Sequence, residues 1–148
     1  MTSLLLAIHF AATWYLVGLC WLVQRVQYPL MSTVGREAFA AYEAGHVSRI
    51  GPVVAPMMLV ELATGLLLLA IGGQEFRRPI FLIALALLVA IWLSTFLIQV
   101  PLHASLGAEF DVRAHASLVR TNWIRTIAWS VRGAILLWWL SSRGLETA

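Results

Sequence analysis

The stretch IFLIALALLVAIWLSTFLI, from Ile80 to Ile98, decides the fold of this chain. It contains no charged side chain, and its polar side-chain groups are the indole N–H of Trp92 and two hydroxyls near its end. A helix rises about 1.5 Å per residue, so a stretch of this length approaches the roughly 30 Å of hydrocarbon in a bilayer. The stretch therefore predicts a transmembrane helix.

Three further segments have the same character: Leu4–Val23, Ile50–Ile71 and Ile127–Ser142. The last is short for a span unless its helix begins earlier, near Ala114. The whole chain is 61% hydrophobic and only 11% charged, which is far from the composition of a soluble globular protein. We expect an all-α integral membrane four-helix bundle that occupies residues 1–148 as a single domain.

The connection from Gln24 to Arg49 is longer than a turn and is rich in helix-forming residues after Gly35. It predicts a short interfacial helix between spans one and two. Proline is tolerated in the first turn of a helix, so Pro52 is expected to open the second span. Pro101 is expected to distort the end of the third.

The charge pattern predicts an orientation. The net charge is +3, and all the basic residues are arginine. More of them flank the first and third connections than the opposite side, so the positive-inside rule places both termini outside the cytoplasm, in a bacterial inner (plasma) membrane. We expect the lipid bilayer and a lipophilic small molecule as partners and no nucleic acid, and a homo-oligomer stays open.

Polar residues within the spans share helix faces, because residues three, four or seven apart are neighbours on a helix. These residues are His9, Thr13, Cys20 and Gln24 in the first span, Glu61 in the second, Thr95, Gln99 and His103 in the third, and His115, Asn122, Arg125, Trp129 and Arg132 in the fourth. A charge at the bilayer centre costs roughly 2.5–3.5 kcal/mol. We therefore predict that Glu61 and Arg132 contact each other inside the bundle, either as a structural clamp or as part of a site.

Histidines and carboxylates also gather at the end of the bundle where spans one and three finish. Histidine suits zinc, copper or iron, and the candidate metal ligands are His46, His103, His115 and His9. Their spacings match no metal motif, and a hydrogen-bonded substrate pocket or a solvated rim stays equally open.

The motif Gln99-Val-Pro-Leu-His103, followed by Arg120-Thr-Asn-Trp-Ile-Arg125-Thr, resembles the anthrone-oxygenase-like family of small four-helix membrane proteins. His103 stands where asparagine is common in that family. The resemblance implies oxidation of a lipophilic, often aromatic or polyketide-like substrate without a dedicated cofactor. Its matching positions are Gln99, His103, Arg120, Asn122, Trp123 and Arg125.

A second stretch, Ile8-His9-Phe-Ala-Ala-Thr-Trp14, is similar to the opening helix of haem-binding membrane oxidases related to protoporphyrinogen oxidase. That similarity implies His9 as an axial haem ligand. The Leu-Pro-Arg sequence that usually follows is missing here.

These patterns lead to three hypotheses. The first is a membrane oxidoreductase in which His103 or His115 is the general base, and Arg125 and Asn122 stabilise an enolate or phenolate. The residues expected to bind its substrate are Gln99, Trp123, Arg120, Trp129, Glu61 and Arg132. The second hypothesis is a haem- or metal-binding membrane protein. The first hypothesis needs no cofactor, and haem or a divalent metal is the alternative. The third is a non-enzymatic membrane subunit or assembly factor.

Overall fold

The computed structural model describes the backbone of residues 2–146 and the side chains of residues 2–142. Throughout this range the ordered elements are helical. In chain order they are α1 (Thr2–Leu22), a π-helical turn (Val23–Gln27), α2 (Tyr28–Met31), α3 (Arg36–Ile71), a 3-10 turn (Gln74–Arg77), α4 (Pro79–Ser94), a second π-helical turn (Thr95–Gln99), α5 (Val100–Ala108) and α6 (Val112–Glu146). The prediction of an all-helical chain is confirmed.

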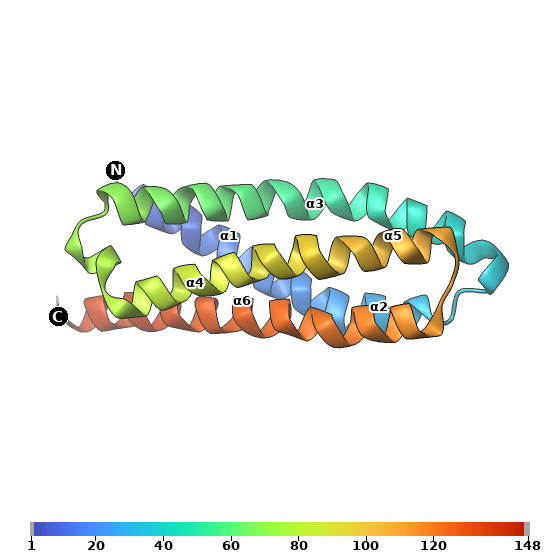
Figure 1. The fold of residues 1–148 in the computed structure, drawn as a ribbon. Coiled ribbons are helices and arrows are strands. Elements are labelled where there is room, and N and C mark those ends of the chain that lie inside the picture. The colour runs from blue at the N-terminus through green and yellow to red at the C-terminus, as the bar shows by residue number, and fades with distance from the viewer. Residues whose placement is uncertain (1, 147–148) are drawn as a thin grey trace.

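Four long rods result, because each π-helical turn joins two helices without a break. The rods are Thr2–Met31, Arg36–Ile71, Pro79–Ala108 and Val112–Glu146. They run alternately up and down beside one another (Figure 1). The beginning of α1, the end of α6 and the connection from α3 to α4 lie at one end of the molecule, and the other two connections lie at the opposite end.

The first three rods are long and apolar enough to cross a membrane. Among the described residues the fourth rod is not in that group, and it carries an arginine at positions 113, 120, 125 and 132. The predicted orientation of the termini, which rests on the arginines that flank the connections, stays a prediction.

The predicted short interfacial helix is not a separate element. Helix α3 begins at Arg36 and continues to Ile71, so Pro52 does not open a span but lies inside a helix, as does Pro56. A proline inside a helix removes one backbone hydrogen bond. Both proline rings are exposed here, and the continuous run of helix formers on either side keeps the helix intact. The consequence is that Glu43 and His46 belong to the same rod as Glu61.

Two proline-associated π-helical turns give the chain a repeated local feature. The expected distortion at Pro101 is confirmed, since the turn Thr95–Gln99 ends two residues before it. The turn Val23–Gln27 lies in the same way before Pro29. A π-turn inserts a residue and changes the face that the following residues present. Each turn contains one deeply buried glutamine, Gln24 or Gln99.

The ends of the long helices are fixed by local interactions. Asp111 precedes α6, and its Oδ1 accepts the backbone N–H groups of Arg113 at 2.6 Å and Ala114 at 2.9 Å. These two hydrogen bonds lower the pKa of the Asp111 carboxyl, because they favour its charged form. At the end of α3, a Cβ added to Gly72 would lie 2.3 Å from the Leu68 carbonyl oxygen, so no larger residue fits there without a backbone shift.

Many apolar side chains are exposed on the outside of the bundle, and polar side chains lie among hydrophobic ones in its interior. Leu97, Leu59 and Ile127 expose more than half of their surface, whereas Glu61 and Asn122 expose none. On α6 the contrast is clear from its two faces: the exposed residues include Ile124, Ile127, Val131, Leu137 and Trp138, and the buried ones include Asn122, Arg125, Thr126 and Arg132. The polar stripes predicted from spacing therefore point into the bundle.

Candidate functional site

A buried ion pair links α3 to α6, and the polar side chains around it form a cluster inside the bundle. Arg132 donates from Nη2 and Nε to Glu61 Oε1, at 3.0 and 3.2 Å. Thr13 donates to the same oxygen at 2.7 Å, and Trp129 Nε1 donates to Oε2 at 3.0 Å. Arg132 also donates from Nη1 to the carbonyl of Ala84 on α4. The predicted Glu61–Arg132 contact is confirmed, and it joins all four rods.

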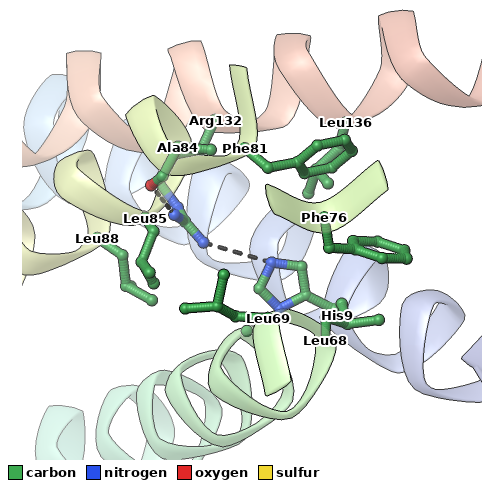
Figure 2. Close-up of a pocket in the computed structure, with 11 residues that line it drawn as sticks. His9, Leu68, Leu69, Phe76, Phe81, Ala84, Leu85, Leu88, Arg132 and Leu136 are labelled. Atoms are coloured by element: carbon green, nitrogen blue, oxygen red, sulfur yellow. Dashed lines mark hydrogen bonds between the residues drawn. The ribbon is translucent and has the colours of Figure 1, made fainter. Parts of the chain in front are cut away.

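His9 completes this cluster (Figure 2). Thr64 donates its hydroxyl proton to the backbone carbonyls of Val60 and Glu61, so its oxygen accepts from His9 Nδ1 at 2.8 Å. A proton on Nδ1 leaves Nε2 as an acceptor in the neutral ring, and Arg132 Nη2 lies 3.5 Å from it. Both nitrogens of His9 are therefore engaged.

The space beside this cluster is small. A cavity of about 40 Å³ lies between His9, Arg132 and apolar side chains, among them Phe76, Phe81 and Leu88 (Figure 2). That is room for about one water molecule. Because its side chains are already hydrogen-bonded to one another, this cluster has the properties of a structural clamp between helices.

The second polar region surrounds a chamber of about 630 Å³. Its walls are largely apolar, and they come from all four rods. The polar or aromatic residues that line it are Cys20, Tyr28, Glu43, His46, Trp92, Thr95, Phe96, Gln99, His103, Asn122, Arg125 and Trp129. Volumes of roughly 300–1,000 Å³ are usual for small-molecule sites, so the chamber is large enough for a ligand.

The chamber reaches the outer surface between the second and third rods. Val47 and Leu59 of α3 line it together with Phe96 of the second π-turn and Val100 of α5. All four are also exposed on the outside of the bundle. The rim of the opening is therefore apolar.

A chain of hydrogen bonds connects three side chains in the chamber wall. His103 Nδ1 lies 2.5 Å from Glu43 Oε1, and His103 Nε2 lies 2.8 Å from the Tyr28 hydroxyl. With the Nδ1 proton donated to the Glu43 carboxylate, Nε2 accepts the proton of Tyr28. Glu43 is 1% exposed, so its carboxylate lies in the interior of the bundle. This is the arrangement of a histidine oriented by a carboxylate.

His46 lies between the chamber and an outer groove. It lines the chamber and also the groove of about 410 Å³ that includes Gln27, Tyr42 and Arg49. Its Nδ1 is 2.6 Å from Gln27 Nε2, and its ring centroid is 5.3 Å from that of His103. The two histidines thus connect the inner and outer spaces.

Amide side chains extend the network across the bundle. Asn122 Nδ2 donates to Gln24 Oε1 at 2.9 Å, and Gln24 Nε2 donates to the carbonyl of Val119 at 3.1 Å. Gln99 Nε2 donates to Thr121 Oγ1 at 2.9 Å. These contacts hold both buried glutamines, one from each π-helical turn, against α6.

Several buried polar atoms around the chamber have no hydrogen-bond partner among the described residues. They are Glu43 Oε2, Gln99 Oε1, Trp92 Nε1 and Arg125 Nε. The Arg125 guanidinium lies 5.2 Å from the centroid of the Trp129 ring and next to the Tyr28 hydroxyl. Buried polar groups are nearly always paired in folded proteins, so this concentration marks the chamber as incomplete.

The structure brings together six of the residues predicted for a site. These residues line the chamber: His46, Gln99, His103, Asn122, Arg125 and Trp129. Six others are placed elsewhere. Glu61, Arg132 and His9 belong to the buried ion-pair cluster. His115 lies 2.8 Å from the backbone carbonyl of Tyr28 through Nε2, outside the chamber lining. Arg120 is exposed, and Trp123 packs edge-on against Trp21 with ring centroids 5.5 Å apart.

The metal candidates do not converge. Within the described part of the chain, no group of three or more histidine, cysteine or carboxylate side chains is placed to hold a metal ion. His9 and His115 lie in different surroundings from His46 and His103.

Sequence reasoning missed Glu43, Tyr28 and Trp92. Glu43 was assigned to an interfacial helix, and Tyr28 to the connection after the first span. Two signals could have found Glu43 and Tyr28. Glu43 lies three residues before His46, which places both on one helix face, and Tyr28 lies four residues after Gln24 in the first polar stripe.

No family model, curated protein or solved structure matches the chain. The site must therefore be interpreted from its own geometry.

Proposed function

We propose that this chain is an integral membrane oxidoreductase of four transmembrane helices, which binds a lipophilic substrate in the chamber. The observation that carries the proposal is the carboxylate-oriented histidine, Glu43–His103, in the wall of a large apolar chamber. Apolar volume binds a lipophilic molecule, and the histidine supplies acid–base chemistry beside it.

The two-faced character of α6 supports a fourth span. Its arginines at 125 and 132 are buried in the bundle, while apolar residues such as Ile127 and Val131 face outward. Intramembrane charges almost always face a bundle interior and are paired there. The low hydropathy of this rod therefore comes in part from buried arginines that lipid would not contact.

The apolar rim between α3 and α5 supports lateral access from the bilayer. A lipophilic molecule dissolved in the membrane would meet Leu59, Phe96 and Val100 before any polar group. Such a substrate would not need to leave the hydrocarbon to enter the chamber.

The acid–base chemistry follows from the hydrogen-bond chain. His103 takes a proton from the substrate directly or through Tyr28, and Glu43 stabilises the imidazolium that forms. Arg125 and Asn122 line the same chamber and would stabilise the resulting enolate or phenolate. The resemblance to anthrone oxygenases supplies the overall reaction, R₂CH₂ + O₂ → R₂C=O + H₂O, with dioxygen as the oxidant.

The test is oxygen consumption by the purified protein in lipid nanodiscs with anthrone as substrate, together with absorbance of the anthraquinone product. His103→Ala should abolish turnover with the helical circular dichroism retained. Glu43→Gln should reduce kcat, whereas Glu37→Gln, an exposed residue of the same helix, should leave it unchanged. Equal turnover by His103→Ala and the parent protein would remove this residue from the mechanism, and a folded parent protein that consumes no oxygen would overturn the proposal.

An optical spectrum and metal analysis of the same preparation address the haem and metal alternative. His9 could ligate haem only by giving up its contact to Thr64 or Arg132. A Soret band or stoichiometric metal would favour that alternative over the oxygenase.

A further inference from the structure

The unpartnered atoms of the chamber describe the polar end of its ligand. Glu43 Oε2 and Gln99 Oε1 are acceptors, and Trp92 Nε1 and Arg125 Nε are donors. They come from α3, from the third rod and from α6, and all four residues line one chamber. A complementary ligand must therefore offer both donors and acceptors, and must reach more than one helix.

The orientation of the Gln99 amide is fixed by its neighbours. Thr121 donates its hydroxyl proton to the carbonyl of Ser117 at 2.7 Å, so its oxygen can only accept from Gln99. The amide nitrogen must then face Thr121, which leaves Oε1 as the unpartnered atom. Gln99 is 1% exposed, so bulk water does not satisfy it.

The charges of Glu43 and Arg125 exclude two further classes of ligand. A fatty acid or a phosphate offers only acceptors at neutral pH, and it would place an anion near the Glu43 carboxylate. An amine offers only donors when protonated, and Arg125 would repel it. A ring that carries hydroxyl groups on opposite sides is neutral, and these groups can donate to Glu43 and Gln99 while their oxygens accept from Trp92 and Arg125.

The remaining surface fits an aromatic ring with a tail. Trp92 and Trp129 provide aromatic surface in the walls. The apolar opening between the second and third rods leads from the chamber to the outside of the bundle, where lipid would lie. We propose that the chamber binds a lipid-soluble quinol, with its ring among the unpartnered atoms and its alkyl tail in the opening. This proposal rests on the membrane chamber proposed above and names the class of its ligand.

Equilibrium binding under nitrogen tests the proposal without turnover. The probes are decylhydroquinone, its dimethyl ether and decylbenzene, titrated calorimetrically into protein-loaded nanodiscs, with empty nanodiscs as the control for partitioning. The three probes share the tail and the ring and differ only in their oxygens. We expect the hydroquinone to bind at least about tenfold more tightly than either of the others, which corresponds to roughly 1.4 kcal/mol.

Matched variants identify the atoms responsible. Trp92→Phe retains an aromatic ring and removes one donor, and Arg125→Gln removes the cation. Each should reduce the preference for the hydroquinone several-fold, whereas Arg113→Gln, an exposed residue of the same helix as Arg125, should retain it.

Equal binding of all three probes would overturn the proposal, as would competition by decanoate that displaces the hydroquinone at lower concentration. Selective binding without oxygen consumption would refute the oxygenase reaction and leave the quinol site standing. Oxygen consumption without selective binding would refute the quinol site and leave the oxygenase reaction standing.

Discussion

Replacing Glu61 by glutamine should destabilise the protein by about 3–5 kcal/mol, the usual cost of breaking a buried ion pair from one side. Arg132 is 2% exposed, and the carboxylate is its only anionic partner among the described ion pairs. In the substituted protein the guanidinium would stay buried without a counter-charge. The amide would add a second fault, because its N–H₂ group would face one of the donors that now surround the carboxylate.

The hydrogen bonds of Glu61 allow the cost of its substitution to be compared with the cost of substituting a neighbouring residue. Glu61 accepts four hydrogen bonds, of which two come from Arg132 and one each from Thr13 and Trp129. Thr13→Val removes one neutral hydrogen bond and should cost about 1 kcal/mol. The larger cost expected for Glu61→Gln therefore reflects the lost counter-charge together with the misplaced N–H₂ group.

The double variant Glu61→Leu/Arg132→Met provides the decisive comparison. Removing both charges leaves no buried ion, so we expect it to be more stable than Glu61→Leu alone, with a coupling energy of about 2 kcal/mol between the sites. The assay is reversible unfolding in mixed micelles with increasing dodecyl sulfate, followed by circular dichroism. Additive effects of the two single substitutions would refute the reasoning, because they would show that the charges do not depend on each other.

Three further predictions concern the helix ends and the orientation. Gly72→Ala should lower the melting temperature by several degrees, since its Cβ would meet a backbone oxygen; Gly35→Ala, which meets nothing within 4 Å, should not. The pKa of Asp111 is lower in the folded state, so its stabilising effect is present above the unfolded pKa and is lost as pH falls through the folded pKa. Asp111→Ala should remove this part of the acid dependence in pH-dependent melting curves, whereas an alanine variant that melts with the parent's full pH dependence would contradict the assignment. Reporter fusions to either terminus should be active outside the cytoplasm, and cytoplasmic activity of both would reverse the proposed orientation.

The rods and the inward polar faces could be predicted from sequence because both follow from local rules. Apolar length gives the helices, and spacing by three or four gives the faces. The Glu61–Arg132 pair could be predicted because a buried charge needs an opposite one. The chain offers few other charged residues at that depth in the membrane, so Arg132 was the partner to expect for Glu61.

The Glu43–His103–Tyr28 chain could not be predicted in the same way. Glu43 and His103 are 60 residues apart in the sequence. Their contact depends on α3 beginning as early as Arg36, inside the segment that the sequence predicts to be the first connection. Pro52 suggested a helix start, and the helix instead continues through it. Tyr28 follows a π-helical turn, which shifts the face that later residues present and so weakens an argument based on regular spacing.

The two polar regions of the bundle differ in whether their hydrogen bonds are complete, and this difference assigns their roles. A ligand at the Glu61–Arg132 cluster would have to displace bonds that are already made. A ligand in the chamber would instead supply partners to the atoms Glu43 Oε2, Gln99 Oε1 and Arg125 Nε, which lack them among the described residues. Trp129 touches both regions, since its Nε1 bonds to Glu61 and its ring lies beside Arg125. Binding in the chamber should therefore stabilise the fold by linkage. Substitution of Glu61 should weaken the fold without changing which ligand the chamber prefers.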